Sequence, residues 1–200
     1  MIYKGDVLKL DKEIVIASGN KGKIKEAQEI LSEYKIVPMS ELGIDIEVEE
    51  DQDTFVGNAI KKAETIAKEI QGKMCMADDS GIEIEYLDGF PGVHTKRWSE
   101  GTDRERNLAI IEKLKGVPRE KRKIKFITAI AIYNGKDTIV QEEYIEGYVT
   151  EEVRGDNGFG FDEIFELENG KTLAELTQEE KNEISARRKA LDNLKMRISN

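Results

Sequence analysis

Two acidic pairs in this sequence have the residue types needed to hold a metal ion beside phosphate groups. Asp78 and Asp79 are adjacent and directly follow the apolar run 74–77. Carboxylates at the end of a strand commonly bind Mg²⁺ next to substrate phosphates, and water completes the octahedral shell. The second pair, Glu49-Glu50, precedes a helical pattern. Taken alone, each pair is also compatible with a turn in an acidic protein.

A glycine-containing loop is the first feature that could bind the phosphates themselves. It consists of Ser18, Gly19, Asn20, Lys21, Gly22 and Lys23, and it lies between a strand pattern and a helical pattern. Glycine lets the backbone approach a ligand closely, and the free N–H groups of a helix start attract phosphate. The spacing is not that of a Walker A loop. A plain turn with surface lysines would also explain these residues.

An aromatic loop and a basic helix could bind a nucleobase. The loop reads Gly158-Phe159-Gly160-Phe161-Asp162, and an exposed phenyl ring in it could stack on a base. A turn with core aromatics would explain the same residues. Lys181, Arg187, Arg188 and Lys189 follow on a helical pattern. Basic residues also favour the C-terminal end of any helix, so they do not by themselves define a site.

Alternating strand and helix patterns must position these groups. Strands are predicted at 14–17, 74–77, 82–86, Lys123–Tyr133 and Lys136–Val149. The last two are joined at Asn134-Gly135, where a tight hairpin turn needs positive φ at both residues. Four helices are predicted. The first carries Ile24, Ala27, Leu31 and Tyr34 on one face. The second begins at the N-cap Asp53-Thr54 and turns inward Phe55, Ala59, Ala63, Ile66, Ala67 and Ile70. The third covers Asp103–Leu114 and the fourth about Gln178–Ile198. This order predicts an α/β fold with three layers and a mixed sheet.

Composition limits the classes of function. The chain has 200 residues, 36% of them charged, and a net charge of −10, which argues against a nucleic-acid-binding protein. No apolar run is long enough to span a membrane, and the N-terminus lacks a signal-peptide pattern. We therefore expect a cytoplasmic protein with one domain over residues 1–200, of which 1–12 form an N-terminal extension. Cys75 is the only cysteine, and its apolar neighbours predict a buried thiol rather than a reactive one.

The order of the motifs resembles the inosine triphosphate pyrophosphatase family closely. The resemblance covers about Ile14 to Leu194. It rests on segments 17–23, 54–63, 77–81, 89–97, 158–162, 170–175 and 179–190. It implies a curved mixed sheet, two lobes with a substrate cleft between them, and a homodimer. The implied activity is hydrolysis of noncanonical purine nucleoside triphosphates (ITP, dITP and XTP) to the monophosphate and pyrophosphate.

The resemblance also assigns roles to individual residues. Ser18 to Lys23 and Lys62 are expected to hold the triphosphate. Asp79 is expected to be the general base and to bind Mg²⁺ together with Glu49 and Asp78. The adjacent Glu50 is the alternative to Glu49, because the match to the family motif can shift by one residue. The substrate-binding positions, several of them around the purine, are Ser80, Phe159, Gly160, Phe161, Asp162, Lys181, Ala186 and Arg187. Arg187 can only donate hydrogen bonds, so it would favour a purine carbonyl at position six over an amino group.

Three positions depart from the family pattern. Ala186 stands where a histidine is usual, which leaves base selectivity to Arg187. Glu163 replaces a proline after Asp162, which is expected to loosen that loop, and His94 replaces a common tyrosine. Two other functions remain open: a pyrophosphatase of modified pyrimidine triphosphates, and a nucleotide sensor without turnover.

Overall fold

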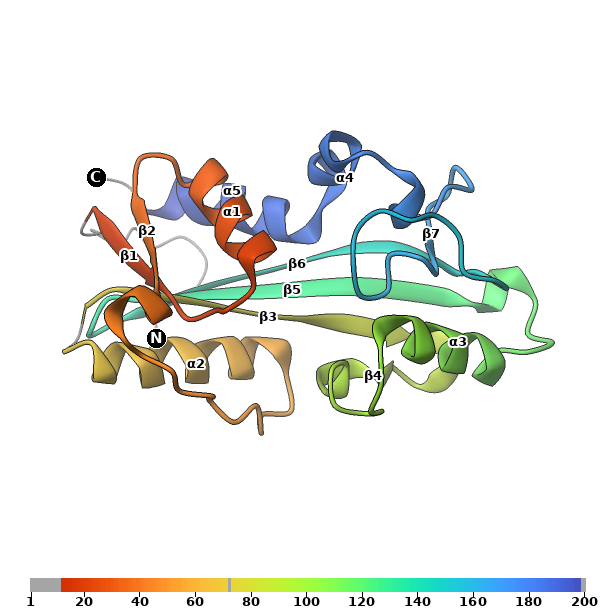
Figure 1. Ribbon diagram of the computed structural model, residues 1–200, viewed down its shortest axis with the longest axis horizontal. Coiled ribbons are helices and arrows are strands. Elements are labelled where there is room, and N and C mark those ends of the chain that lie inside the picture. The colour runs from red at the N-terminus through yellow and green to blue at the C-terminus, as the bar shows by residue number, and fades with distance from the viewer. Residues whose placement is uncertain (1–11, 72, 199–200) are drawn as a thin grey trace. The chain divides into compact units, whose positions relative to one another are not determined.

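The protein is described by a computed structural model that covers residues 12–71 and 73–198 (Figure 1). The chain forms two compact units. Unit 1 contains the chain up to Ser80, Thr128–Glu143 and the chain from Ala186 onward, and unit 2 contains Gly81–Ile127 and Tyr144–Ser185. The extension predicted for residues 1–12 lies outside the described residues, except for Lys12.

A mixed β-sheet is the scaffold, as predicted. Its strands are β1 (Glu13–Ile16), β2 (Lys35–Pro38), β3 (Cys75–Ile84), β4 (Phe90–Pro91), β5 (Lys123–Tyr133), β6 (Thr138–Val149) and β7 (Phe165–Glu166). Their order is β2-β1-β3-β5-β6-β7, and β4 pairs with β3. β1 pairs in parallel with β2 and β3, whereas β4 and β7 pair antiparallel with β3 and β6. β2 was not predicted.

Unit 1 has three layers. The helices are α1 (Lys21–Ile30), α2 (Phe55–Glu69), α3 (Asp103–Lys113), α4 (Gln178–Ile184) and α5 (Ala186–Arg197). In unit 1, α1 and α5 cover one face of the sheet and α2 covers the other (Figure 1). Side chains alternate along a strand, so Ile14 and Ile16 pack in the core beneath α1 and α5, and Val15 packs in the core beneath α2. The predicted α/β class is confirmed.

The start of α2 confirms a local prediction. Thr54 is its N-cap, and the Thr54 hydroxyl accepts a hydrogen bond from the Gly57 amide at 3.0 Å. This bond satisfies one of the amides that a helix start leaves unpaired. The six residues predicted to face inward are all buried: Phe55, Ala59, Ala63, Ile66, Ala67 and Ile70.

The region around the aspartates differs from the prediction of two strands with a turn between them. β3 runs unbroken from Cys75 to Ile84, so Asp78 and Asp79 lie inside a strand. Both are buried, and basic side chains contact each of them. The strand can therefore continue through two carboxylates without leaving an uncompensated charge.

The predicted C-terminal helix is two helices. It breaks at Ser185, whose backbone is extended (φ −54°, ψ 130°), between α4 and α5. At this residue the chain also leaves unit 2 and enters unit 1.

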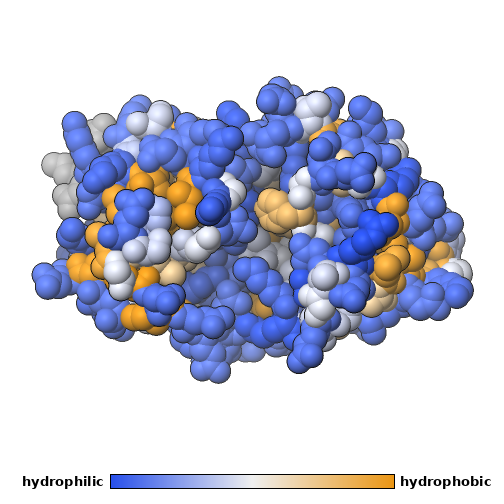
Figure 2. Space-filling view, in the orientation of Figure 1, coloured by the Kyte–Doolittle hydropathy of each residue, from blue (hydrophilic) through white to orange (hydrophobic). Residues whose placement is uncertain are grey.

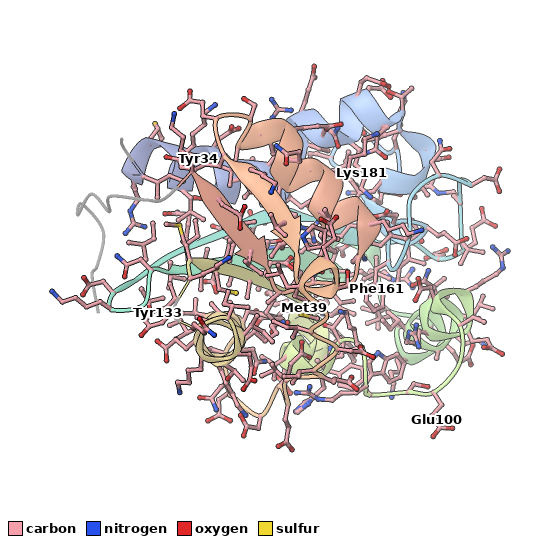
Figure 3. The ribbon with its side chains drawn as sticks, turned by 60° about the vertical axis from the view of Figure 1, so that its left-hand side comes forward. Tyr34, Met39, Glu100, Tyr133, Phe161 and Lys181 are labelled. Atoms are coloured by element: carbon pink, nitrogen blue, oxygen red, sulfur yellow. The ribbon has the colours of Figure 1, made fainter. Side chains whose placement is uncertain are left out.

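Two turns also differ from prediction. α1 ends at Ile30, so Leu31 and Tyr34 are buried from the turn that follows, and the Tyr34 hydroxyl donates to the Ile198 carbonyl at 3.2 Å (Figure 3). In the hairpin connection only Gly135 of the Asn-Gly pair has positive φ (93°). The Asn134 side chain accepts from the Lys136 and Asp137 amides at 3.0 and 2.8 Å. This is an Asx-type turn of four residues, which delays β6 to Thr138.

The surface reflects the high charge of the sequence. Hydrophilic side chains dominate the face seen in Figure 2, and hydrophobic ones form small patches. None of the described helices is long and apolar enough to cross a membrane.

Cys75 lies fully buried beneath α2, as predicted, and burial raises the pKa of its thiol to about 12. A raised pKa keeps the thiol protonated up to that pH, and the thiolate is the reactive form. We therefore expect 5,5′-dithiobis(2-nitrobenzoate) to leave the native protein unlabelled for hours at pH 8, and to label it at once in denaturant. Rapid stoichiometric labelling of the native protein would contradict this expectation.

Candidate active site

The two aspartates of β3 face opposite sides of the sheet. Successive residues of a strand point to alternate faces. Asp78 contacts Lys23 of α1 and Arg187 of α5, whereas Asp79 contacts Asn58 and Lys62 of α2. The expectation that Asp78 shares a metal ion with Asp79 is therefore corrected, because the structure does not bring the two carboxylates together.

Asp79 is the centre of a polar cluster on the α2 face of unit 1. The Lys62 ammonium donates to Asp79 Oδ1 at 3.0 Å and to Glu50 Oε1 at 2.8 Å. The Asn58 amide donates to Asp79 Oδ2 at 3.0 Å. Asn58 Oδ1 in turn accepts from the Gln52 amide at 3.0 Å, which ties the segment carrying Glu50 to α2. Two carboxylates thus converge on one cationic group.

The pKa of Asp79 is raised above its ordinary value. Burial is the main cause, because it disfavours the charged form, and the nearby Glu50 carboxylate raises it further. Lys62 acts in the opposite direction without reversing the shift. For Lys62, burial lowers the pKa, but Asp79 and Glu50 outweigh burial and raise it. A buried carboxylate with a raised pKa is a typical general base.

The two candidate metal ligands Glu49 and Glu50 differ in their surroundings. Glu49 is exposed, whereas Glu50 is partly buried and joins the Asp79 cluster through Lys62. Among residues 12–71 and 73–198, no group of three or more His, Cys, Asp or Glu side chains is close enough to hold a metal ion. Asp79 and Glu50 are the two carboxylates that pair with Lys62. Mg²⁺ commonly binds one or two carboxylates and takes its other ligands from phosphates and water.

Asp78 forms a second cluster on the other face. Lys23 Nζ lies 2.7 Å from Asp78 Oδ1, and Arg187 Nε lies 3.2 Å from Asp78 Oδ2. Arg187 also contacts Glu26 of α1 at 2.8 Å and donates to the Ser80 hydroxyl at 3.4 Å. Burial alone would raise the pKa of Asp78, but Lys23 and Arg187 lower it well below its ordinary range. Asp78 therefore stays ionised and links α1, β3 and α5.

The predicted phosphate loop is partly open. Gly19, Asn20, Lys21 and Gly22 are exposed, whereas Lys23 is buried against Asp78. Asn20 is the N-cap of α1, and its side chain accepts from the Gly22 and Lys23 amides at 2.9 and 3.2 Å. A side chain added at Gly19 would meet no atom within 4 Å, so the backbone there faces open space.

Three other predicted site residues are less open than expected. Within unit 1, the Ser80 hydroxyl donates to Asp78 at 3.0 Å and lies within hydrogen-bond distance of the Thr128 hydroxyl, at 3.1 Å. Ala186 begins α5 and is only 2% exposed, so a histidine there would require the core to repack. Phe161 is buried in unit 2.

The aromatic loop of unit 2 presents a ring to solvent. Phe159 is half exposed, and the Lys181 ammonium of α4 lies 4.7 Å from the centre of its ring. Asp162 is buried, pairs with Lys181 and accepts from the Phe159 amide at 2.8 Å. Gly158 has positive φ (82°), and a side chain there would collide with Asp162. A flat, cation-flanked aromatic surface of this kind can stack on a nucleobase.

Helix α3 anchors this loop. Asp103 accepts from the Gly160 amide at 2.9 Å, and Asn107 donates to the Gly160 carbonyl at 2.9 Å. Glu163 accepts from Asn107 and from Arg104, both at 3.1 Å. The expectation that Glu163 loosens the loop is therefore wrong, because its side chain adds two bonds that a proline could not make.

Glu163→Ala should loosen the loop that the native glutamate anchors. We expect the amides of residues 158–162 to exchange with deuterium about tenfold faster, since a charged hydrogen bond contributes about 1.5 kcal/mol. Mass spectrometry of the exchanged peptides measures this change. Glu112→Ala on the exposed side of α3 is the matched control, and equal protection in both variants would contradict the anchoring.

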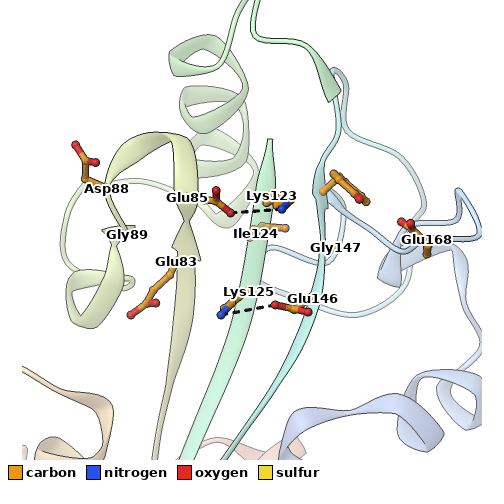
Figure 4. A pocket seen from close by; sticks show the side chains of 11 residues that line it. Glu83, Glu85, Asp88, Gly89, Lys123, Ile124, Lys125, Glu146, Gly147 and Glu168 are labelled. Atoms are coloured by element: carbon orange, nitrogen blue, oxygen red, sulfur yellow. Dashed lines mark ion pairs between the residues drawn. The ribbon is translucent and has the colours of Figure 1, made fainter. Parts of the chain in front are cut away.

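A pocket of about 720 Å³ in unit 2 is unsuited to an anion. Five carboxylates and two lysines line it, together with Gly89, Ile124, Gly147 and Tyr148. Both lysines are already paired, Lys123 with Glu85 at 3.9 Å and Lys125 with Glu146 at 3.6 Å (Figure 4). A triphosphate would meet net negative charge there.

Sequence reasoning assigned no role to two residues of the site. Asn58 orients Asp79, and its position four residues before Lys62 places both on one face of α2. Glu26 lies within the first two turns of α1 and pairs with Arg187. Only the spacing of Asn58 could have indicated its role from sequence, because the partner of Glu26 lies 161 residues away.

Comparison with known proteins identifies the family of this chain. Residues 14–197 match the model of the Ham1 family. A dITP/XTP pyrophosphatase of Bacillus subtilis is 44% identical over 189 residues, which cover 92% of this chain and 95% of that protein. A dITP/XTP pyrophosphatase of Clostridium perfringens is 42% identical over 195 residues, with 92% and 96% covered.

Solved structures give the same result. The Staphylococcus aureus Ham1 protein superimposes with a TM-score of 0.85 at 37% identity, covering 92% of this chain and 96% of that one. A HAM1 protein from Coxiella burnetii also gives 0.85, at 38% identity and the same coverage. The fold is that of an α/β protein of the Ham1 type, and the chain belongs to the Ham1 family. The resemblance stated from the motifs is confirmed.

Proposed function

We propose that this protein hydrolyses noncanonical purine nucleoside triphosphates, namely ITP, dITP and XTP, to the nucleoside monophosphate and pyrophosphate. The observation that carries this proposal is the buried Asp79 carboxylate, held by Asn58 and Lys62 beside Glu50. Relatives named dITP/XTP pyrophosphatase, 44% and 42% identical over most of the chain, support the substrate class.

Asp79 acts as the general base. Its raised pKa makes the ionised carboxylate a better proton acceptor than an exposed aspartate. Asn58 holds one carboxylate oxygen and Lys62 the other, which fixes the direction from which a water can approach. The proton of the attacking water passes to Asp79, and the new bond forms at the α-phosphorus as pyrophosphate leaves.

Asp79 and Glu50 form a donor set that fits Mg²⁺. Both are hard oxygen ligands, and both already share one cation, the Lys62 ammonium. When bound, Mg²⁺ neutralises the charge of the triphosphate oxygens and so favours departure of pyrophosphate. We place Glu50 in this role rather than Glu49, because Glu49 is exposed and Glu50 shares Lys62 with Asp79.

The remaining residues bind the substrate. The loop Ser18 to Lys23, with the open backbone at Gly19 and the exposed Lys21, binds phosphates of the substrate together with Lys62. Phe159, flanked by Lys181 and supported by Asp162, stacks on the purine. Arg187 is the residue that we expect to distinguish a carbonyl from an amino group, as its donor-only chemistry suggests.

Product identification tests this function. Incubation with ITP and Mg²⁺, followed by ion-exchange separation, should give IMP and pyrophosphate. IDP with orthophosphate would exclude the proposed reaction, and no turnover would favour a nucleotide sensor. In a panel of triphosphates, ITP and XTP should be cleaved at least tenfold faster than ATP. Preferred cleavage of a modified pyrimidine triphosphate would show instead that the protein is a pyrophosphatase of modified pyrimidine triphosphates.

We also expect a homodimer that acts in the cytoplasm on the nucleotide pool. Light scattering coupled to gel filtration measures the mass of the assembly. A single 22.7 kDa species at micromolar concentration would contradict the dimer.

A further inference from the structure

A second pocket of unit 2 is lined by arginines and glutamates. It has a volume of about 580 Å³ and lies around the start of β5 and the segment that follows β6. It is lined by Arg119, Arg122, Val149, Thr150, Glu151, Glu152, Arg154 and Glu166. None of these residues was assigned a role by the motifs or by the proposed reaction.

Arg122 is a buried cation with too little compensation. Its side chain is 2% exposed, and Nη1 lies 3.4 Å from Glu151, whose side chain is 85% exposed. The Nε atom of Arg122 has no hydrogen-bond partner among the described residues. Burial lowers the pKa of Arg122, and Glu151 offsets this only in part. A buried charge with one solvent-exposed partner is costly to the fold.

The other two arginines do not leave an acid free for Arg122. Arg119 and Arg154 both bind Glu166, each at 2.7 Å, and Arg119 also lies 4.0 Å from Glu168, so Arg154 shares its carboxylate partner with a second guanidinium group. The Nε atom of Arg154 is buried and has no partner in the described part of the chain. Three arginines and three glutamates line the pocket, but among those that are less than one-third exposed, Arg122 and Arg154 are opposed by Glu166 alone.

The Thr150 hydroxyl is a further hydrogen-bonding group at this pocket. Thr150 is 5% exposed, and its Oγ1 makes no hydrogen bond to any residue that the structure describes. Its backbone is fixed, because the Thr150 amide donates to the Ile164 carbonyl at 3.0 Å. Buried polar atoms are normally paired, and three that are not, Arg122 Nε, Arg154 Nε and Thr150 Oγ1, belong to residues that line the same pocket.

We propose that this pocket binds a phosphoryl oxyanion, either free phosphate or pyrophosphate or the phosphate of a mononucleotide. Guanidinium groups with a neighbouring threonine hydroxyl are typical donors to phosphate. A tetrahedral oxyanion accepts bonds from several directions, whereas a planar carboxylate offers two oxygens in one plane. The exposed Glu151 and Glu152 at the same pocket would repel a long polyanion, so the ligand is small. This site does not depend on the proposed hydrolysis.

Thermal unfolding with and without phosphate tests the pocket. In Mg²⁺-free buffer with EDTA and matched ionic strength, phosphate at ten times its Kd should raise the wild-type Tm by about 3–5 °C. Arg122→Met should lose that shift, and Arg104→Met, which removes an exposed arginine of the same unit, should keep it. Phosphate bound in unit 1 would stabilise both variants equally, so equal shifts in the two variants would overturn the proposal.

A second variant guards against failure of Arg122→Met to fold. The Thr150 hydroxyl makes no hydrogen bond to any of the described residues. The isosteric Thr150→Val should therefore keep the anion-free Tm and bind phosphate at least fivefold more weakly by calorimetry. Unchanged affinity would overturn the proposal.

The same measurement with different ligands shows which kind of phosphoryl compound the pocket binds. Inorganic phosphate and pyrophosphate that give the Arg122-dependent shift would identify a free anion, and a shift with IMP alone would identify a nucleotide. An equal Arg122-dependent shift with acetate would overturn the phosphoryl class.

Discussion

Asp79→Asn should abolish turnover while the protein still folds and binds nucleotide. The substitution keeps the size of the side chain and the contacts with Asn58 and Lys62 that an amide can make, but it removes the proton acceptor. Loss of a general base alone lowers kcat by about 10²–10⁴-fold, and loss of a metal ligand adds to that. Pyrophosphate release from ITP at saturating Mg²⁺ measures the effect. A variant within tenfold of the wild-type rate would mean that Asp79 is not the base.

The adjacent glutamates offer a matched control for this prediction. Glu50→Gln and Glu49→Gln are the same chemical change one residue apart. We expect Glu50→Gln to raise the Mg²⁺ concentration for half-maximal activity by roughly 10–100-fold, a range that even outer-shell partners of a metal reach. Glu49→Gln should leave it unchanged, because Glu49 is exposed. A higher Mg²⁺ requirement for Glu49→Gln than for Glu50→Gln would show that Glu49 is the metal ligand.

Arg187→Ala should be the most destabilising single change in unit 1. The guanidinium is buried and compensates Asp78 at 3.2 Å and Glu26 at 2.8 Å. Removing one partner of a buried ion pair typically costs about 3–5 kcal/mol. For a chain of this size that corresponds to a Tm lower by about 6–20 °C. Urea unfolding at pH 7 measures the difference, and Arg188→Ala, at an exposed neighbouring position, is the control.

The loss of stability caused by Arg187→Ala should depend on pH in a definite direction. The native pKa of Asp78 is lowered, so the ion pair contributes stability above the pKa of about 3.9 that an unfolded aspartate has. That contribution is lost as the pH falls from there toward the native pKa. The stability difference between wild type and Arg187→Ala should therefore shrink below pH 4. A difference that stays constant from pH 7 to pH 3 would show that packing, not charge, carries it.

Arg187→Lys separates stability from base selection. Lysine keeps the positive charge beside Asp78 but lacks the planar fork of five donors. We expect most of the stability to return while the ratio of kcat/KM for ITP over ATP falls roughly fivefold or more, as for an unsatisfied buried donor. An unchanged ratio would leave base selection to another part of the protein.

Local features of the sequence predicted much of the fold correctly. The Thr54 cap, the inward face of α2 and the strand β5 depend on neighbours within one or two turns, or on alternation along one strand. Such contacts are encoded by spacing alone. The order of motifs was likewise sufficient to identify the family, because the motifs extend over nearly the whole chain.

The arrangement of charges was decided by the tertiary structure. An unbroken β3 sends Asp78 and Asp79 to opposite faces, and partners 55 and 109 residues away neutralise Asp78. The same kind of long-range contact brings Glu50 rather than Glu49 to Lys62, and gives Glu163 its partners on α3. A buried charge is stable only with its counter-charge, and that counter-charge comes from whichever helix packs on the same face. Residue type and spacing show that a charge is present, but only the packed structure shows which charge opposes it.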